Sequence, residues 1–183
     1  GRRIIHKLIF SKKSDLIQIN DPYLSIENLA YLINFDSIYG KVKKKITVRG
    51  DYLLTGNNKI LFTKDKSLLN HDLNNKVNLL IDSSGIKKNH DMIKRREVKN
   101  KFKTIITHTY DKADFHIIFG VNEKKYDKKK HNIISSSICD AVAIGPVINL
   151  IDKYFKIKNG SITTLHPWLG YQNLMDGPSR SFA

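Results

Sequence analysis

The chain has little sulfur, proline or glycine. Its 183 residues include one cysteine, two methionines, four prolines and ten glycines. One cysteine excludes an internal disulfide and is typical of a reducing compartment, and no signal-peptide pattern opens the chain, so we expect a cytoplasmic protein. No apolar run approaches the ~20 residues that a membrane-spanning helix needs. The sequence therefore predicts a soluble protein with no membrane partner.

Acidic residues are also scarce. The chain has 32 Lys and Arg against 17 Asp and Glu, a net charge of +15, with lysines clustered at 43–45, 124–125 and 128–130. A basic surface attracts phosphorylated cofactors and nucleic acid, although a lysine-rich composition also arises simply as a solvated surface. No aromatic RNA-binding motif, zinc-finger spacing or helix-turn-helix signature accompanies the charge, so nucleic acid is only a weakly supported partner.

The apolar residues predict an α/β fold. Hydrophobic residues make up 40% of the chain, enough for one domain and part of a second. Short apolar runs predict buried strands, and helical stretches lie between several of them, which indicates a mostly parallel sheet. The expected strands are 16–19, 77–82, 103–107 and 116–119, the expected helices are 3–10, 25–32 and 141–148, and residues 132–134 are a further apolar run. Residues 43–49 and 59–62 are expected to form a hairpin around 55–58.

Cys139 is the first candidate for chemistry. It lies directly before the expected helix 141–148, where unpaired N–H groups and the helix dipole favour a thiolate. His166 follows downstream and is a candidate base for the thiol proton. A lone cysteine is also often a small buried hydrophobic residue, so the pattern alone leaves both interpretations open.

The wider context resembles phosphorylating glyceraldehyde-3-phosphate dehydrogenase. That family carries S-N-A-S-C-T-T-N-C, an apolar helix, T-T-x-H and D-G-P, and this chain has Cys139, His166 at the family's separation, and Asp176-Gly177-Pro178. The upstream blocks occur in the family's order: Asn20-Asp21-Pro22, Phe35-Asp36-Ser37 with Gly40, Asp82-Ser83-Ser84-Gly85, and Gly120-Val121-Asn122 with Lys125-Tyr126-Asp127. The resemblance extends from Gly1 to Ser179.

The resemblance implies a Rossmann-type NAD-binding domain at 1–138 and the beginning of an α+β catalytic domain at 139–183. Aligned to the family, Gly1 is the last glycine of its phosphate-binding loop. Family members are longer, so both ends of this chain look cut. They are homotetramers, and that assembly is expected when the chain is complete.

The expected cofactor is NAD. Asn20-Asp21 and Ser83-Ser84-Gly85 directly follow strand-like runs, which places them at the ligand-binding edge of a parallel sheet. Asp21 has the position of the acidic residue that binds the adenosine ribose, and its charge favours NAD over NADP. Lys64 lies near the family's adenine-region arginine, and His108 lies where the family has a serine near the nicotinamide. The implied cofactor-binding residues are Gly1, Asn20, Asp21, Lys64, Ser84, Gly85 and His108.

In the family mechanism, Cys139 would add to an aldehyde and His166 would accept the proton, after which phosphate or water would release the thioester. The substrate pocket departs from the family. Ile138 and Asp140 flank the cysteine, and Asp140 replaces a hydroxyl, repels phosphate and disfavours the thiolate. Leu169 stands where the family places a threonine for the substrate phosphate.

Two functions are therefore open. The first is an NAD-dependent dehydrogenase with an altered, less anionic aldehyde substrate. The second is an inactive family member that binds nucleic acid or another anionic partner. Retention of Cys139 and His166 favours the enzyme.

Overall fold

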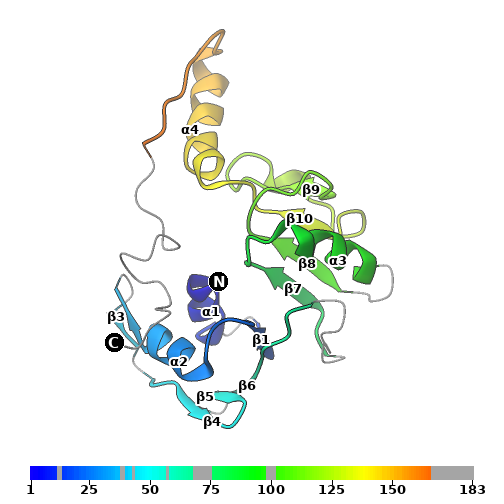
Figure 1. The fold of residues 1–183 in the computed structure, drawn as a ribbon. Helices are drawn as coiled ribbons and strands as arrows, with labels where there is room; N and C mark the ends of the chain where they lie inside the picture. Colours follow the sequence, from blue (N-terminus) through cyan, green and yellow to red (C-terminus); the bar gives the residue numbers. More distant parts are fainter. Residues whose placement is uncertain are drawn as a thin grey trace. The chain divides into compact units, whose positions relative to one another are not determined.

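The chain forms two compact units. The computed structural model describes residues 1–11, 14–37, 40–42, 44–56, 58–67, 76–97 and 102–165. Within these ranges one unit runs up to residue 67 and the other starts at residue 76 (Figure 1). No helix among these residues has the length and apolar character needed to cross a membrane.

The first unit is a mixed sheet with helices. Its elements are α1 (Arg2–Ile9), β1 (Gln18–Asn20), α2 (Ile26–Asn34), β2 (Phe35–Asp36), β3 (Gly40–Lys41), β4 (Thr47–Arg49), β5 (Tyr52–Thr55) and β6 (Asn58–Thr63). The main sheet has the order β1-β6-β5-β4. The β1 and β6 strands are parallel, whereas β4, β5 and β6 form an antiparallel meander. The carboxyl ends of β1 and β6 therefore meet at one edge.

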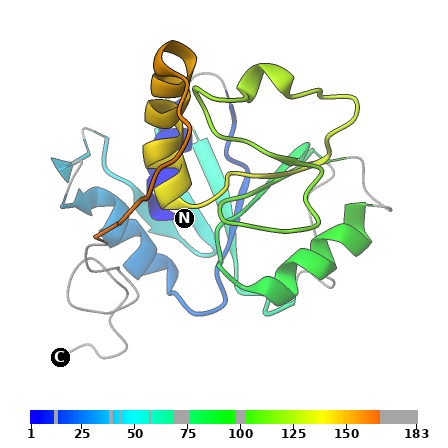
Figure 2. The same cartoon turned by 90° about the horizontal axis from the view of Figure 1, so that it is seen from above.

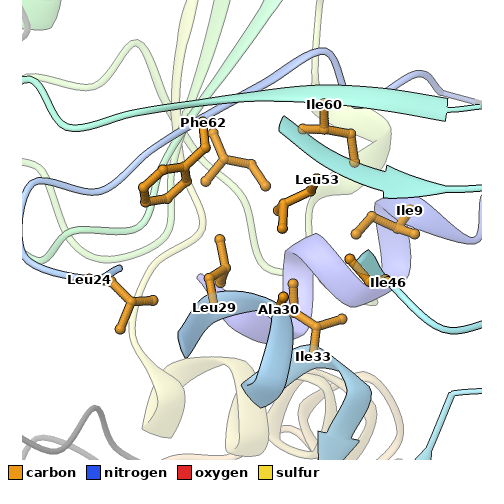
Figure 3. Packing of buried hydrophobic residues seen from close by; sticks show 10 residues of the cluster. Ile9, Leu24, Leu29, Ala30, Ile33, Ile46, Leu53, Ile60 and Phe62 are labelled. Carbon is orange, nitrogen blue, oxygen red and sulfur yellow. The ribbon is translucent and has the colours of Figure 1, made fainter. Parts of the chain in front are cut away.

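Apolar side chains from the helices and the sheet form the core of this unit (Figure 3). Ile33 on α2, Leu53 on β5 and Ile60 on β6 are each at most 1% exposed. The helix α2 begins at the cap residue Ser25, whose Oγ accepts a hydrogen bond from the Asn28 N–H at 3.1 Å. This cap and the apolar face of α2 explain why the helix forms where it does.

Two buried polar groups hold this unit together. The Asn34 side chain donates to Ile46 O and accepts from Ile46 N, both at 2.8 Å, which joins the end of α2 to the segment before β4. The Asp36 carboxylate is 3% exposed and forms ion pairs with Arg2, at 3.3 Å, and with Arg3. These ion pairs hold the start of α1 against β2.

The second unit is a parallel sheet. It contains β7 (Leu79–Asp82), α3 (Lys87–Glu97), β8 (Lys103–Ile106), β9 (Phe115–His116), the 3-10 helix η1 (Glu123–Lys125), β10 (Ile133–Ser135) and α4 (Cys139–Phe155). The strand order is β7-β8-β10-β9, and every pair is parallel. All three residues of β10 are buried, as expected for a central strand. The helix α3 lies beside these strands (Figure 2).

The sequence predictions hold for most elements. The Rossmann-type α/β class with parallel strands is confirmed, and so are the helices near 3–10 and 25–32 and the strands near 77–82 and 103–107. The apolar run at 132–134 forms most of the further strand β10. The predicted hairpin was wrong in one respect. Gly50, at φ 55°, turns the chain between β4 and β5, so Tyr52–Thr55 forms a middle strand that the sequence analysis had missed.

Candidate cofactor and catalytic sites

Asn20 joins the ends of β1 and β6. Its Oδ1 accepts hydrogen bonds from Thr63 Oγ1 and from the Asp65 N–H, each at 2.9 Å. Its Nδ2 donates to Asp65 O at 3.0 Å. The side chain thus holds both backbone groups of Asp65 and fixes the loop that presents the exposed Lys64. Asn20 acts here as a positioning residue for a cation at the sheet edge.

Asp21 lies at the same edge as Asn20. Its N–H donates to Thr63 O at 3.0 Å, which continues the pairing of the two strands by one residue. Its Oδ1 accepts from the N–H groups of Tyr23 and Leu24 at 2.9 and 3.1 Å. These bonds orient the carboxylate at the start of the loop that leads to α2.

Gly1 forms the N-terminal cap of α1. Its carbonyl accepts the N–H groups of Ile4 and Ile5 at 2.9 and 3.0 Å.

In the second unit, Ser84 and Gly85 follow β7. The buried Asp82 accepts the Ser84 N–H at Oδ1 at 3.0 Å, and Ser84 Oγ accepts the Ile86 N–H and the Asn89 Nδ2 group at 3.2 and 2.9 Å. Gly85 has φ +71°, and a Cβ built there meets nothing within 4 Å. A non-glycine residue would be strained at this φ. The loop is thus ordered and leaves open space beside its backbone.

His108 lies after β8 in the same unit. Its carbonyl accepts a hydrogen bond from Ser135 Oγ at 2.7 Å, and its ring lies 4.6 Å from the ring of His90. His90 is 2% exposed and had not been identified from the sequence. No spacing pattern marks it, because its neighbours in space come from other elements.

Cys139 is the first residue of α4, and it is exposed. The preceding Ile138 is the cap residue in extended conformation, and its side chain supplies no capping hydrogen bond. Cys139 Sγ lies 3.8 Å from Asp140 Oδ1, a sulfur hydrogen bond. The thiol therefore meets a carboxylate as well as the positive end of a helix of 17 residues.

The turn at 118–122 supports α4. Asn122 accepts the Ile118 N–H at Oδ1 at 2.8 Å and donates to His116 O at 2.9 Å, which shapes the turn. Asn149 on α4 donates to Gly120 O at 3.2 Å. A Cβ on Gly145 would lie 3.1 Å from the Ile118 side chain, so glycine permits the close approach. The G-V-N block quoted in the sequence analysis thus has a structural role: it holds the helix that begins at Cys139.

The remaining predicted site residues either flank Cys139 or lie outside the described part of the chain. Ile138 is exposed at 47% and Asp140 is half-buried, both beside Cys139. His166 and Leu169 lie outside the described residues. Among the described residues, no group of three or more His, Cys, Asp or Glu side chains could hold a metal ion.

Each unit by itself offers polar groups that suit part of a nicotinamide dinucleotide. In the first unit, the Asp21 carboxylate can accept hydrogen bonds from ribose hydroxyls, and Lys64 supplies a cation on an adjacent loop. The Ser84 hydroxyl and the open space beside Gly85 can admit a polar ligand close to the backbone. Each of these side chains follows the carboxyl end of a strand, where open α/β sheets bind ligands.

Comparisons with known proteins agree with this chemistry. Residues 1–90 match the family described as glyceraldehyde 3-phosphate dehydrogenase, NAD binding domain. Glyceraldehyde-3-phosphate dehydrogenase 1 of Kluyveromyces marxianus is 29% identical over 180 residues, which cover 98% of this chain and 54% of that protein. Glyceraldehyde-3-phosphate dehydrogenase 2 of Bacillus subtilis is 28% identical over 185 residues, covering 98% of this chain and 53% of that protein. The chain spans about half the length of the curated relatives it matches.

The fold and the family match indicate a Rossmann-type NAD-binding domain, and NAD is the cofactor of this domain type. Over nearly its whole length the chain is similar to glyceraldehyde-3-phosphate dehydrogenases, at 28 to 29% identity.

Proposed function

We propose that the protein is an NAD-dependent aldehyde dehydrogenase that uses Cys139 as its nucleophile. The observation that carries the proposal is the exposed Cys139 thiol at the first position of α4, in a chain related over nearly its whole length to glyceraldehyde-3-phosphate dehydrogenases. In this role His166 is the base for the thiol proton. The cofactor-binding roles remain with Gly1, Asn20, Asp21, Lys64, Ser84, Gly85 and His108.

Cys139 and His166 each have a defined role in the proposed reaction. The sulfur of Cys139 adds to the carbonyl carbon of an aldehyde, a C–S bond forms, and the thiol proton passes to His166. The adduct is oxidised to a thioester by loss of hydride, for which bound NAD supplies the acceptor. Attack by phosphate or water then cleaves the C–S bond and returns the thiolate.

The Asp140 carboxylate disfavours a phosphorylated aldehyde as the substrate. Its carboxylate lies 3.8 Å from the reacting sulfur, so an anionic substrate or inorganic phosphate would approach against a like charge. Ile138, exposed on the other side of Cys139, offers apolar surface. We therefore propose an uncharged aldehyde as substrate, water as the acceptor of the acyl group, and Leu169 as part of the substrate pocket.

We further propose that residues 1–138 form the cofactor domain and that residues 139–183 begin a catalytic domain. Apolar side chains on the second half of α4 support this division: Leu150 is 58% exposed, Tyr154 65% and Phe155 80%. Such a surface is typical of a helix that packs against further protein. The greater length of the curated relatives supports the same assignment. Homotetrameric assembly and a cytoplasmic location of the complete protein are part of the same proposal, because the family resemblance implies them.

A spectrophotometric assay of NADH tests the proposal. The natural protein at its full length is mixed with NAD and either glyceraldehyde 3-phosphate or unphosphorylated glyceraldehyde, with and without phosphate. We expect NADH from the uncharged aldehyde without added phosphate, and none from Cys139→Ser. Asp140→Thr is expected to raise the rate with the phosphorylated aldehyde. An unaltered rate in Cys139→Ser would contradict the proposed nucleophile.

A second candidate function is anion binding by a catalytically silent protein. It is favoured by one observation: Lys124, Lys125, Lys128, Lys129 and Lys130 are all exposed around a single loop. Polyanion binding by this loop would be unchanged in Cys139→Ser and would weaken steeply with salt. A folded, NAD-binding protein that forms no NADH with any aldehyde would favour this function.

A further inference from the structure

A cluster of buried polar side chains lies in the second unit, beside the loop at 83–85. Asp82 is 6% exposed and His90 is 2% exposed, and His90 Nε2 lies 3.7 Å from Asp82 Oδ2. The His90 ring lies 4.6 Å from the ring of His108 and 4.7 Å from that of Tyr110. Among the described residues, no hydrogen bond reaches His90 Nε2, His108 Nε2 or Asp82 Oδ2, although all three atoms are buried.

The cluster connects the ends of three strands. Asp82 ends β7 and holds the Ser84 N–H through its other oxygen, Oδ1. His108 follows β8, and its carbonyl accepts the hydroxyl of Ser135, the last residue of β10. That hydroxyl also accepts the Ser137 N–H at 3.2 Å, two residues before Cys139. The cluster therefore adjoins both the loop at 83–85 and the approach to the candidate nucleophile.

The charged groups around His90 would do little to stabilise a proton on its ring. On α3 itself the neighbours are Lys87 and Asp91, and Asp91 is 63% exposed and lies 3.6 Å from Lys112. Asp82 on β7 and His108 in the segment after β8 also lie close enough to His90 to act on its charge. Burial, followed by the effect of His108, lowers the pKa of His90, while Asp82 and Asp91 oppose that shift more weakly.

We propose that His90 is a positioning residue for the loop at 83–85 and that, with His108 and Asp82, it makes the order of this loop and the binding of NAD dependent on pH. In the structure the rings of His90 and His108 pack against each other, and Asp82 accepts the hydrogen bond from the Ser84 N–H. The proposal rests on the function proposed above only in assigning NAD contacts to Ser84 and Gly85.

Protonation disrupts the cluster for a physical reason. A proton on His90 places a cation in a buried site, 3.7 Å from the Asp82 carboxylate and beside the His108 ring. Water must then enter to solvate the charged ring, and the Asp82 carboxylate turns toward it. The bond from the Ser84 N–H to Asp82 Oδ1 is lost, and the loop opens.

The test measures NAD affinity of the whole chain by calorimetry between pH 7.5 and 5.5, together with the NMR amide signals of Ser84 and Gly85. For the wild-type protein we expect affinity to fall by about three- to tenfold on acidification, since one linked proton changes affinity by up to about tenfold per pH unit below its pKa and burial lowers the pKa of His90. In His90→Met, which cannot take up a proton, the change should be less than threefold. His116→Gln, which alters a histidine of the same sheet outside the cluster, should behave as wild type.

The loop signals separate this proposal from the proposed function. If NAD does not bind at any pH, pH-dependent loss of the Ser84 and Gly85 signals in the wild type, absent in His90→Met, still supports the switch. Wild-type signals that stay unchanged down to pH 5.5 would overturn it, as would an equal pH response in His90→Met. If that variant does not fold, the His90 ring signal is titrated in the wild type: protonation that coincides with loop opening supports the proposal, and protonation without opening refutes it.

Discussion

Replacing Asn20 with alanine removes the side chain that fixes the Lys64 loop. Three hydrogen bonds disappear: those that Oδ1 accepts from Thr63 Oγ1 and the Asp65 N–H, and the one that Nδ2 donates to Asp65 O. A hydrogen bond contributes a net of about 0.5 to 1.5 kcal/mol. Because Asn20 is only half-buried, water can replace part of what is lost. We therefore expect the free energy of unfolding to fall by about 2 kcal/mol.

Urea unfolding followed by circular dichroism measures this loss, and hydrogen exchange of the Asp65 amide localises it. NAD affinity should fall as well, because Lys64 is no longer held at the sheet edge. Asn20→Asp keeps the acceptor oxygen for two of the three bonds but replaces the Nδ2 donor by a carboxylate oxygen that faces Asp65 O, so it should be destabilised as well, through one lost bond and a new repulsion. Asn28→Ala is the matched control on α2 and should stay within about 0.5 kcal/mol of wild type. A loss in Asn20→Ala no greater than in the control would refute the reasoning.

Three further perturbations have defined outcomes. Gly85→Ala places a Cβ at φ +71° and should weaken NAD binding at a cost of about 1 to 2 kcal/mol in loop stability, measured by calorimetry and hydrogen exchange. Asp36→Ala leaves Arg2 and Arg3 without their buried partner and should lower the free energy of unfolding by about 3 kcal/mol in urea melts. Because the pKa of His90 is lowered in the folded protein, unfolded chains bind the proton first, so its contribution is complete above pH 6.5 and declines below it. Urea melts should show a slope of up to about 1.4 kcal/mol per pH unit that His90→Met abolishes.

The sequence was informative where local patterns decide the structure. The cap at Ser25, the apolar runs of the parallel strands and the helix that follows Cys139 all carry signals within a few residues. The middle strand Tyr52–Thr55 was missed because it is short and its partners on either side already matched a hairpin. Glycine at Gly50, in a left-handed conformation, was the available signal for the additional turn.

In the candidate sites, too, local sequence signals predict the positions of some residues and miss the contacts of others. Asp21, Ser84 and Cys139 each follow a strand or begin a helix, so chain order predicts their positions along the fold. The bonds that Asn20 makes to Asp65, and the contact of His90 with Asp82 and His108, depend on packing between segments distant in the sequence. No local pattern encodes such contacts, and His90 in particular lies within a polar helix with nothing to distinguish it.

Mass spectrometry of the acylated protein shows whether Cys139 carries the acyl group. The natural protein at its full length is mixed with NAD and a stoichiometric amount of aldehyde, quenched in acid, digested and analysed while NADH is recorded. The account predicts a burst of NADH with an acyl group on the peptide that contains Cys139, and neither signal in Cys139→Ser. NADH formation without an adduct on Cys139, or equal NADH from Cys139→Ser, would contradict it.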